Sequence, residues 1–354
     1  MKIFRSLLLL TLLAVAATGC TLSTGQSQKT VDETMTGGVF RTVDQGVTWR
    51  QLGLIQTTAS KKLHIFGVNT SVLVADPSDP KALYLGTFAD GAFFSYDAGL
   101  SWQVMTSLGQ KGIIDLAVDP KNKCVIYAAA VGRIFKTGDC GRTWQEIYSD
   151  NDKHLLIYSV VVDHFASANV YIANARGDVI KSEDSGKSWR TLKNLKGEVR
   201  KLVMDPRDSR TLLAAVYGKG LFRSTDAGVS WQDLTPKLKS VKADKSFRDL
   251  VAAPSTPGFY LLAVDYGLFK TANYGDDWTE INLIPPENRS RINALAVNPL
   301  DNKLIYYDTD TTLYSTVDGG QNWFSRKLPT ARQGSKILAS PLKDNPVYLG
   351  LKTN

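Results

Sequence analysis

The sequence is poor in the residues that usually hold metal ions. Its 354 residues include only three histidines and three cysteines. The histidines, His64, His154 and His164, are scattered and lack the spacing of metal ligands, so we expect no metal site. A glycine-rich phosphate-binding loop is also missing, and we expect no cofactor.

Long apolar runs are missing as well, apart from one near the N-terminus. Residues 7–17 are apolar, follow Lys2 and Arg5, and are too short to span a bilayer. Small residues then lead into Cys20, an arrangement that resembles the lipobox of bacterial lipoproteins. We therefore expect a signal peptide over 1–19 and a lipid on Cys20. The alternative is an ordinary secretory signal with an incidental cysteine.

The chain after this leader divides into a short polar segment and one long domain. Residues 20–36 are rich in Ser, Thr and Gln and cannot bury a core, so we expect a flexible tether. Residues 37–354 carry the repeats described next and are expected to form a single domain. The formal net charge is +8, and Lys2 and Arg5 contribute two of these charges.

A nine-residue motif recurs seven times, and each copy ends in one of the seven tryptophans. The copies are RTVDQGVTW (41–49), FSYDAGLSW (94–102), KTGDCGRTW (136–144), KSEDSGKSW (181–189), RSTDAGVSW (223–231), KTANYGDDW (270–278) and STVDGGQNW (315–323). Gly stands three residues before each Trp. The position five before Trp is occupied by Asp44, Asp97, Asp139, Asp184, Asp226, Asn273 and Asp318.

A second motif, such as LVMDPRDSRTLLAA (202–215), precedes every copy of the first except the copy at 41–49. Both motifs predict strand–turn–strand, so each repeat of about 45 residues contributes four short strands. This pattern predicts an all-β, seven-bladed β-propeller of four-stranded antiparallel blades. The unmatched strands at 337–351 should pair with those at 38–52 and close the ring, which removes two exposed edges.

The nine-residue motif resembles the Asp-box, or BNR repeat, of sialidases, family 74 glycoside hydrolases, sortilin-type receptors and the photosystem II assembly and stability factor. In such families the box lies on the propeller periphery, which implies a structural role. The residues agree with this role. Asp226 can accept backbone N–H groups across a turn, Gly228 can adopt a positive φ, and Trp231 can pack against neighbouring strands.

The boxes and the turns between the first and second strands share one face of the propeller. Function is therefore expected on the opposite face, which carries the loops between the second and third strands and the blade-to-blade connections. The blade-to-blade connections on that face carry 17 Lys and Arg against six Asp and Glu. A smaller set lies at or beside the starts of the inner strands and is predicted to bind a ligand: Asp115, Arg200, Lys201, Arg248, Asp249, Arg291 and Lys336. Residues expected to border the same site are Arg176, Tyr217, Lys219, Asp265 and Tyr266.

This charge favours an anionic partner, such as a protein or a glycan. Two alternatives are generic solvated lysines and contact with membrane phospholipid beside a lipid on Cys20. An exported protein is not expected to bind nucleic acid, and we expect a monomeric propeller in the cell envelope. The resemblance implies either an assembly or stability factor for a membrane complex, or a receptor or carbohydrate-binding lipoprotein.

A glycoside hydrolase is the alternative function. The Arg-Ile-Pro type of motif found near the N-terminus of sialidases does not occur in this sequence. A pair of carboxylates could still act on the basic face, where the candidates are Asp90, Asp115, Asp249, Asp265 and Asp308. Because no spacing selects a pair, we assign no catalytic residue.

The two remaining cysteines belong to one blade. Cys124 is expected to open the second strand, and Cys140 lies in the turn of the nine-residue motif. A hairpin turning near 131–132 would place them opposite each other, and an exported protein can keep a disulfide. The alternative is two separate small core residues.

Overall fold

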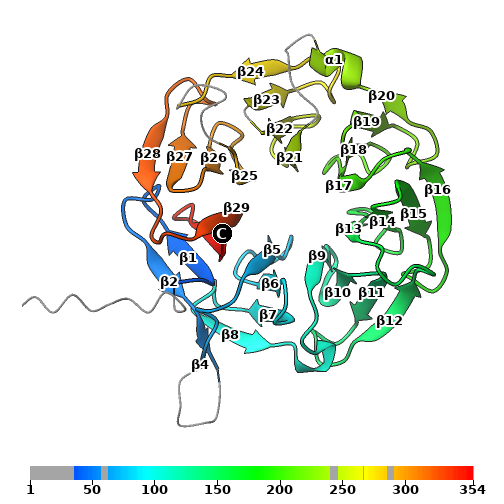
Figure 1. The fold of residues 1–354 in the computed structure, drawn as a ribbon, viewed down its shortest axis with the longest axis horizontal. Coiled ribbons are helices and arrows are strands. Elements are labelled where there is room, and N and C mark those ends of the chain that lie inside the picture. Colours follow the sequence, from blue (N-terminus) through cyan, green and yellow to red (C-terminus); the bar gives the residue numbers. More distant parts are fainter. Residues whose placement is uncertain (1–35, 57–62, 240–245, 266, 285–290, 354) are drawn as a thin grey trace, which may run out of the picture. The chain divides into compact units, whose positions relative to one another are not determined.

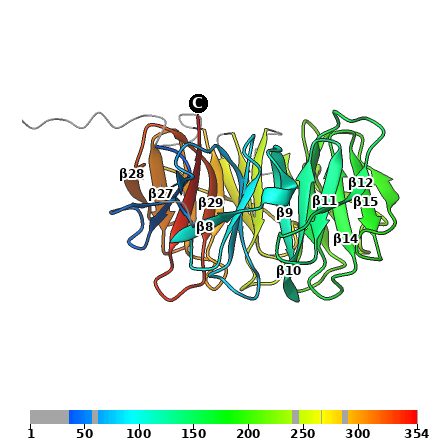
Figure 2. The same cartoon turned by 90° about the horizontal axis from the view of Figure 1, so that it is seen from below.

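The computed structural model describes residues 36–56, 63–239, 246–265, 267–284 and 291–353. The expected signal peptide, Cys20 and all of the expected tether except residue 36 lie outside these ranges. The described strands form seven sheets around a central axis (Figure 1). Each innermost strand contacts the next around the ring, and the last contacts the first. The fold is the predicted seven-bladed β-propeller, and its strands run between two faces of a disc (Figure 2).

Each blade contains four strands in the order predicted from the repeats, and the sheet of blade 1 has two further strands at its outer edge. From blade 1 to blade 7, the inner strands are β5 (Thr70–Ala75), β9 (Ile113–Asp119), β13 (Ile157–Val162), β17 (Val199–Met204), β21 (Phe247–Ala252), β25 (Ala294–Val297) and β29 (Gln333–Ala339). The second strands are β6 (Leu83–Thr87), β10 (Asn122–Ala130), β14 (Val170–Asn174), β18 (Leu212–Val216), β22 (Tyr260–Val264), β26 (Ile305–Asp308) and β30 (Val347–Lys352). The third strands are β7 (Ala92–Ser95), β11 (Arg133–Thr137), β15 (Asp178–Ser182), β19 (Gly220–Ser224), β23 (Gly267–Thr271), β27 (Thr312–Thr316) and β1 (Val39–Thr42). The outer strands are β8 (Ser101–Val104), β12 (Gln145–Ser149), β16 (Arg190–Asn194), β20 (Gln232–Asp233), β24 (Thr279–Ile281), β28 (Phe324–Lys327) and β2 (Arg50–Leu52).

Both ends of the repeat array contribute to blade 7. Strand β1 pairs antiparallel with β30, with Val39 opposite Gly350 and Thr42 opposite Val347. The prediction that the terminal strands close the ring is confirmed. Closure leaves no inner edge exposed, because every inner strand then has a neighbour on both sides.

Short elements occupy some of the connections between blades. A 3-10 helix, η2 (Thr106–Leu108), follows β8, and the one α-helix of the described chain, α1 (Thr235–Lys239), follows β20. Strands β3 (Leu54–Ile55) and β4 (Leu63–His64) extend blade 1 outward, because β3 pairs in parallel with β8. This connection was expected to be a loop. Its extra length, seen as a Trp-to-Trp spacing of 53 rather than 42–47 residues, is used to add these strands.

The core consists of apolar layers between neighbouring blades. Second strands such as β18 and β22 are buried along their whole length, because blades cover both of their faces. Large aromatic side chains fill these layers. Those of the second strands that are almost completely buried are Tyr84, Tyr127, Tyr171, Tyr260, Tyr306, Tyr307 and Tyr348.

The nine-residue motif forms the turn between the third and outer strands. In blade 4 the Asp226 carboxylate accepts the Ser230 N–H at 2.8 Å and the Ser224 hydroxyl at 2.8 Å. The Ser224 hydroxyl in turn accepts the Gly228 N–H, and φ of Gly228 is 90°, as predicted. These hydrogen bonds, led by those to Ser230, lower the pKa of Asp226 to about 2. The turn therefore adds stability above about pH 4, which is lost as the pH falls toward 2.

Blade 5 keeps the same turn although Asn273 replaces the aspartate. The Asn273 carbonyl oxygen accepts the Asp277 N–H at 2.9 Å, and the Asn273 amide donates to the Asp277 carboxylate at 2.9 Å. In blade 5 the carboxylate therefore belongs to the later residue of the pair, Asp277, whereas in blade 4 it belongs to the earlier one, Asp226. Thr271 supplies the hydroxyl that Ser224 supplies in blade 4.

Two faces follow from this arrangement. The turn face carries the turns between inner and second strands and the nine-residue motifs. The loop face carries the loops between second and third strands and the connections between blades. The sequence repeats on the turn face and varies on the loop face, so the loop face is where this chain can carry individual chemistry.

Asp308 is an exception within the core. It ends β26 opposite Ala294, is fully buried, and neither carboxylate oxygen has a hydrogen-bond partner in the described part of the chain. Burial raises its pKa well above the usual range, and the nearby backbone N–H groups of Ala294 and Asp308 oppose this only in part. The six other blades have Gly or Ala at the matching register position: Gly86, Ala129, Ala173, Ala215, Ala263 and Gly350.

We predict that Asp308→Ala makes the protein more stable by about 1–3 kcal/mol at pH 8, because it removes a buried polar group without partners. A folded-state pKa above the unfolded value makes the wild type gain stability as the pH falls toward 4. The variant's advantage should therefore shrink at pH 4–5. Urea unfolding at both pH values measures this, with the exposed Asp90→Ala as control. A less stable variant, or an equal advantage at both pH values, would contradict the account.

Cys124 and Cys140 lie opposite each other in blade 2. Cys124 is in β10, Cys140 is in the turn before β12, and the Cys140 N–H donates to the Cys124 carbonyl at 3.1 Å. A disulfide joins their side chains in the structure. It closes a loop with a sequence separation of 16, for which the chain-entropy account gives about 3 kcal/mol of stabilisation.

We predict that the exported protein, denatured without reductant, shows no thiol at Cys124 or Cys140 when alkylated and analysed by peptide mass spectrometry. Reduction before alkylation should label both. Labelling of both cysteines in the unreduced sample would rule out the bond.

Candidate functional site

The inner strands expose selected side chains on the loop face by means of β-bulges. Six of the seven inner strands show a register shift at the same point near the loop face. A bulge adds a residue outside the ladder and redirects its side chain. The inserted residues, in ring order, are Ser71, Ile114, Tyr158, Arg200, Arg248 and Ser335. Tyr158, Arg200 and Arg248 thus occupy equivalent places on three successive blades.

Arg200 is the centre of an aromatic cluster. Its guanidinium carbon lies 3.6 Å from the centroid of the Tyr217 ring and 5.9 Å from that of Tyr158. Its Nη2 atom forms an ion pair with Glu198 at 2.9 Å, and the Tyr158 hydroxyl donates to the same carboxylate at 3.4 Å. Burial, followed by the charge of Glu198, raises the pKa of Tyr158. Stacking fixes the plane of Arg200 while its outer donors stay near the surface.

A second cluster lies on blades 5 and 6. Arg248 and Arg291 both contact one oxygen of Asp265, and the Arg291 Nε lies 3.2 Å from it. Asp265 belongs to the loop between β22 and β23. Two guanidinium groups therefore share a single carboxylate, which leaves donors for a further anion.

The strand register places Arg200 and Arg248 at the same position of adjacent blades. Each has its own acidic partner in the structure, Glu198 for one and Asp265 for the other. Neither Glu198 nor Tyr158 is among the residues predicted from the sequence to form the site. Alignment of Tyr158 with Arg200 is the signal that could have found it.

The other four predicted residues each lie one position after the bulge residue of their inner strand, further from the loop face. Asp115, Lys201, Asp249 and Lys336 share one register position and pair with Ala129, Ala215, Ala263 and Gly350. Because the inner strands run from the loop face toward the turn face, this ring lies below the bulge residues. The seven members are Val72, Asp115, Ser159, Lys201, Asp249, Ala294 and Lys336.

Charges within this deeper ring act on each other. Burial by itself would lower the pKa of Lys201. The negative charges of Asp249 and Asp115 together outweigh this effect, so the pKa is raised overall. Burial lowers the pKa of Lys336. The Asp115 carboxylate accepts the Val160 N–H of the next blade at 3.0 Å, which links blades 2 and 3. The charges of the two acids and two lysines of this ring cancel. The cationic groups nearer the surface are Arg200 and Arg248 at the bulges.

Some residues expected to border the site have other partners. Arg176 pairs with Asp150 at 2.9 Å and with Asp178 at 3.5 Å, within blade 3 and its connection. Lys219 is exposed. Tyr266, in the loop between β22 and β23, lies outside the described residues. So do several charged residues of the basic connections: Lys61, Lys62, Lys242, Asp244, Lys245, Glu287 and Arg289.

Most of the carboxylates considered for hydrolysis are committed elsewhere. Asp308 is fully buried, Asp265 pairs with arginines, and Asp249 is nine-tenths buried with a bond to the Leu250 N–H. Asp115 binds the backbone of the next blade. Asp90 is exposed.

Two further features of the described ranges bear on function. Within them, no helix is long and apolar enough to cross a membrane. No three His, Cys, Asp or Glu side chains of these ranges gather to hold a metal ion. The expected absence of a metal remains a prediction.

Comparison with known proteins places the chain among propellers. No protein-family model matches it. A xyloglucanase from Paenibacillus sp. is 23% identical over 340 residues, covering 81% of this chain and 30% of the relative. The chain therefore spans less than a third of that relative's length.

Two solved structures show the same fold. The GH74 xyloglucanase from Xanthomonas campestris superposes with a TM-score of 0.64 at 16% identity, covering 86% of this chain and 52% of that one. The structure of YCF48 bound to D1 peptide gives 0.60 at 15% identity, covering 80% and 92%. At these identities the likeness establishes the seven-bladed propeller and nothing finer.

We predict that Asp265→Ala converts the second cluster into a site for a small dianion, since Arg248 and Arg291 lose their shared counter-charge. Sulfate should then raise the melting temperature of the variant by about 2–4 °C more than that of the wild type, compared at equal ionic strength with chloride. Asp344→Ala, an exposed acid on the turn face, is the matched control. An equal sulfate effect on all three proteins would show that the arginines do not converge.

Proposed function

We propose that this protein is a binding propeller that recognises an anionic partner, a protein segment or a glycan, on its loop face. The observation that carries the proposal is the placement of Arg200, Arg248 and Arg291 on three successive blades, two of them on bulges. Bulges that redirect side chains are a recurrent device at binding sites. Arg200 is held in place by Tyr217, so little conformational freedom is lost when an anion binds.

The chemistry of recognition follows from the two acidic partners. Glu198 and Asp265 keep the guanidinium groups oriented and partly neutralised in the free protein. An incoming carboxylate or sulfate would take the remaining donors in a forked geometry. Tyr217, about half exposed, gives an apolar and aromatic surface beside the charge, which suits a peptide or a sugar ring.

The comparisons support this function as a proposal. The YCF48 structure is described with a bound peptide, and this chain covers 92% of its length. A single propeller of this size fits an assembly or stability factor for a membrane complex. The leader 1–19 and Cys20 place the propeller, in this proposal, on the extracytoplasmic side of a membrane as a lipid-anchored monomer, with the basic connections free to meet phospholipid as well.

Glycoside hydrolysis is the second candidate, favoured by the match to a xyloglucanase. Of the five candidate carboxylates named from the sequence, only Asp90 is exposed and without an arginine partner in the described part of the chain, and hydrolysis by this route needs two. The structure of the described residues thus gives binding the better support.

We predict that Arg200→Glu/Arg248→Glu abolishes capture of the partner in a pull-down from detergent-solubilised membranes of the host, while the fold is retained by circular dichroism. Arg142→Glu/Lys187→Glu, an equal charge reversal at exposed positions of the turn face, should capture the partner like the wild type.

Two results would overturn the proposal. One is equal loss of capture in both double variants, which would show that net charge alone matters. The other is release of reducing sugar from xyloglucan by the wild type and its loss in Asp90→Ala, which would make the protein an enzyme.

A further inference from the structure

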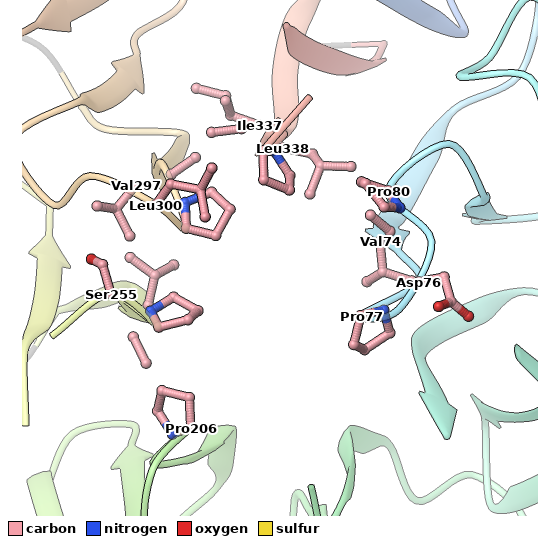
Figure 3. A pocket seen from close by; sticks show the side chains of 18 of the residues that line it. Val74, Asp76, Pro77, Pro80, Pro206, Ser255, Val297, Leu300, Ile337 and Leu338 are labelled. Carbon is pink, nitrogen blue, oxygen red and sulfur yellow. The ribbon is translucent and has the colours of Figure 1, made fainter. Parts of the chain in front are cut away.

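A cavity lies on the turn face, on the side of the propeller away from the arginine clusters. It occupies about 830 Å³ at the centre of the ring (Figure 3). That volume is in the range of small-molecule sites. Its wall is aliphatic and comes from inner strands of blades 1, 5, 6 and 7, including Val74, Val251, Ala296 and Leu338.

A ring of prolines forms the mouth of this cavity. The second residue of each turn between inner and second strands is proline in six blades and histidine in the other: Pro77, Pro120, His164, Pro206, Pro254, Pro299 and Pro341. All of these except Pro120 line the cavity. Proline fixes φ, so the mouth is formed before any ligand arrives. Burial lowers the pKa of His164, which keeps this position neutral near pH 7.

In six of the seven turns the next residue is held at the mouth by a hydrogen bond, whereas the turn that begins with Ala253 has no side-chain acceptor. The side chain that begins the turn accepts its N–H, for example Asp205 from Arg207 at 2.8 Å and Asn298 from Leu300 at 2.8 Å. Leu300 lines the cavity and is nevertheless 67% exposed. Covering an exposed apolar side chain at the edge of an apolar cavity with an apolar ligand is favourable, because it removes apolar area from water.

Arg207 is the one cation among the cavity-lining residues given by the structure. Its Nε donates to the Pro254 carbonyl of the next blade at 3.2 Å, which fixes the guanidinium at the mouth. Asp76 is the one acid among the cavity-lining residues given by the structure, and its carboxylate lies on the side away from the cavity centre, where it accepts the Ser78 and Asp79 N–H groups (Figure 3). The acids beside Arg207 have other partners, Asp205 the Tyr260 hydroxyl and Asp208 the Arg210 guanidinium. The hydroxyl of Ser255, beside Pro254, has no partner within the described ranges.

We propose that this cavity binds a free anionic amphiphile, with its aliphatic or aromatic body against the inner strands and its acid group at Arg207. An apolar wall with a single fixed cation at the opening selects this class over sugars, which need many polar contacts, and over cations. The site is independent of the loop-face function, because the two lie at opposite ends of the inner strands. Both can be filled at once.

The test uses two fluorescent probes with the same apolar body, 8-anilinonaphthalene-1-sulfonate, which is anionic, and N-phenyl-1-naphthylamine, which is neutral. The wild type should bind the sulfonate saturably, and monomeric decanoate should displace it. Arg207→Gln should weaken the sulfonate by about tenfold, the equivalent of about 1.4 kcal/mol, and leave the neutral probe unchanged. Leu300→Glu should weaken both.

Phe88→Glu is the matched control, since Phe88 is a similarly exposed apolar residue on the loop face. It should bind like the wild type. Absence of saturable binding, equal loss in Leu300→Glu and Phe88→Glu, or an equal effect of Arg207→Gln on both probes would overturn the proposal. Binding only to phosphatidylglycerol vesicles, without displacement by decanoate, would overturn it too.

Discussion

The pairing of β1 with β30 is the contact on which the rest of the structure depends. Four residues of β1, placed some 300 positions before their partners, complete blade 7 and close the ring. Without it, blade 7 would keep only β29 and β30, and an open array would expose strand edges. Closure also sets the spacing of the inner strands, which determines where Arg200 and Arg248 stand on neighbouring blades.

The repeated residues stabilise the turns and the ring, and the residues that differ between blades are left for other roles. The hydroxyl, aspartate and glycine of each nine-residue motif satisfy the turn locally, and blade 5 shows that the hydrogen bonds matter more than which end carries the acid. The two proposed sites both use positions where one blade departs from the others. Arg200 and Arg248 among the bulge residues and His164 among the prolines are such departures, whereas Asp308 among small core residues imposes a cost on folding.

The sequence predicted the fold in detail because aligning seven copies of a repeat shows which segments are equivalent strands and in what order they follow each other. It also placed the arginines on the loop face, at or beside the starts of the inner strands. It could not show that Asp265 takes both Arg248 and Arg291, since that depends on a loop conformation. Asp308 was considered a surface carboxylate because position along a strand gives its face but not its depth. The turn-face cavity was not predicted, because a proline in a repeated motif indicates a turn but not the space that several such turns enclose.

The central claim is that a partner meets this protein on the loop face beside Arg200. It is tested most directly by placing a photo-crosslinking amino acid at Tyr217, on that face, or at Val229, an exposed apolar position on the turn face. Irradiation of the protein in host membranes should give one crosslinked species from position 217 and none from position 229. The same species from position 229, with none from 217, would contradict the account.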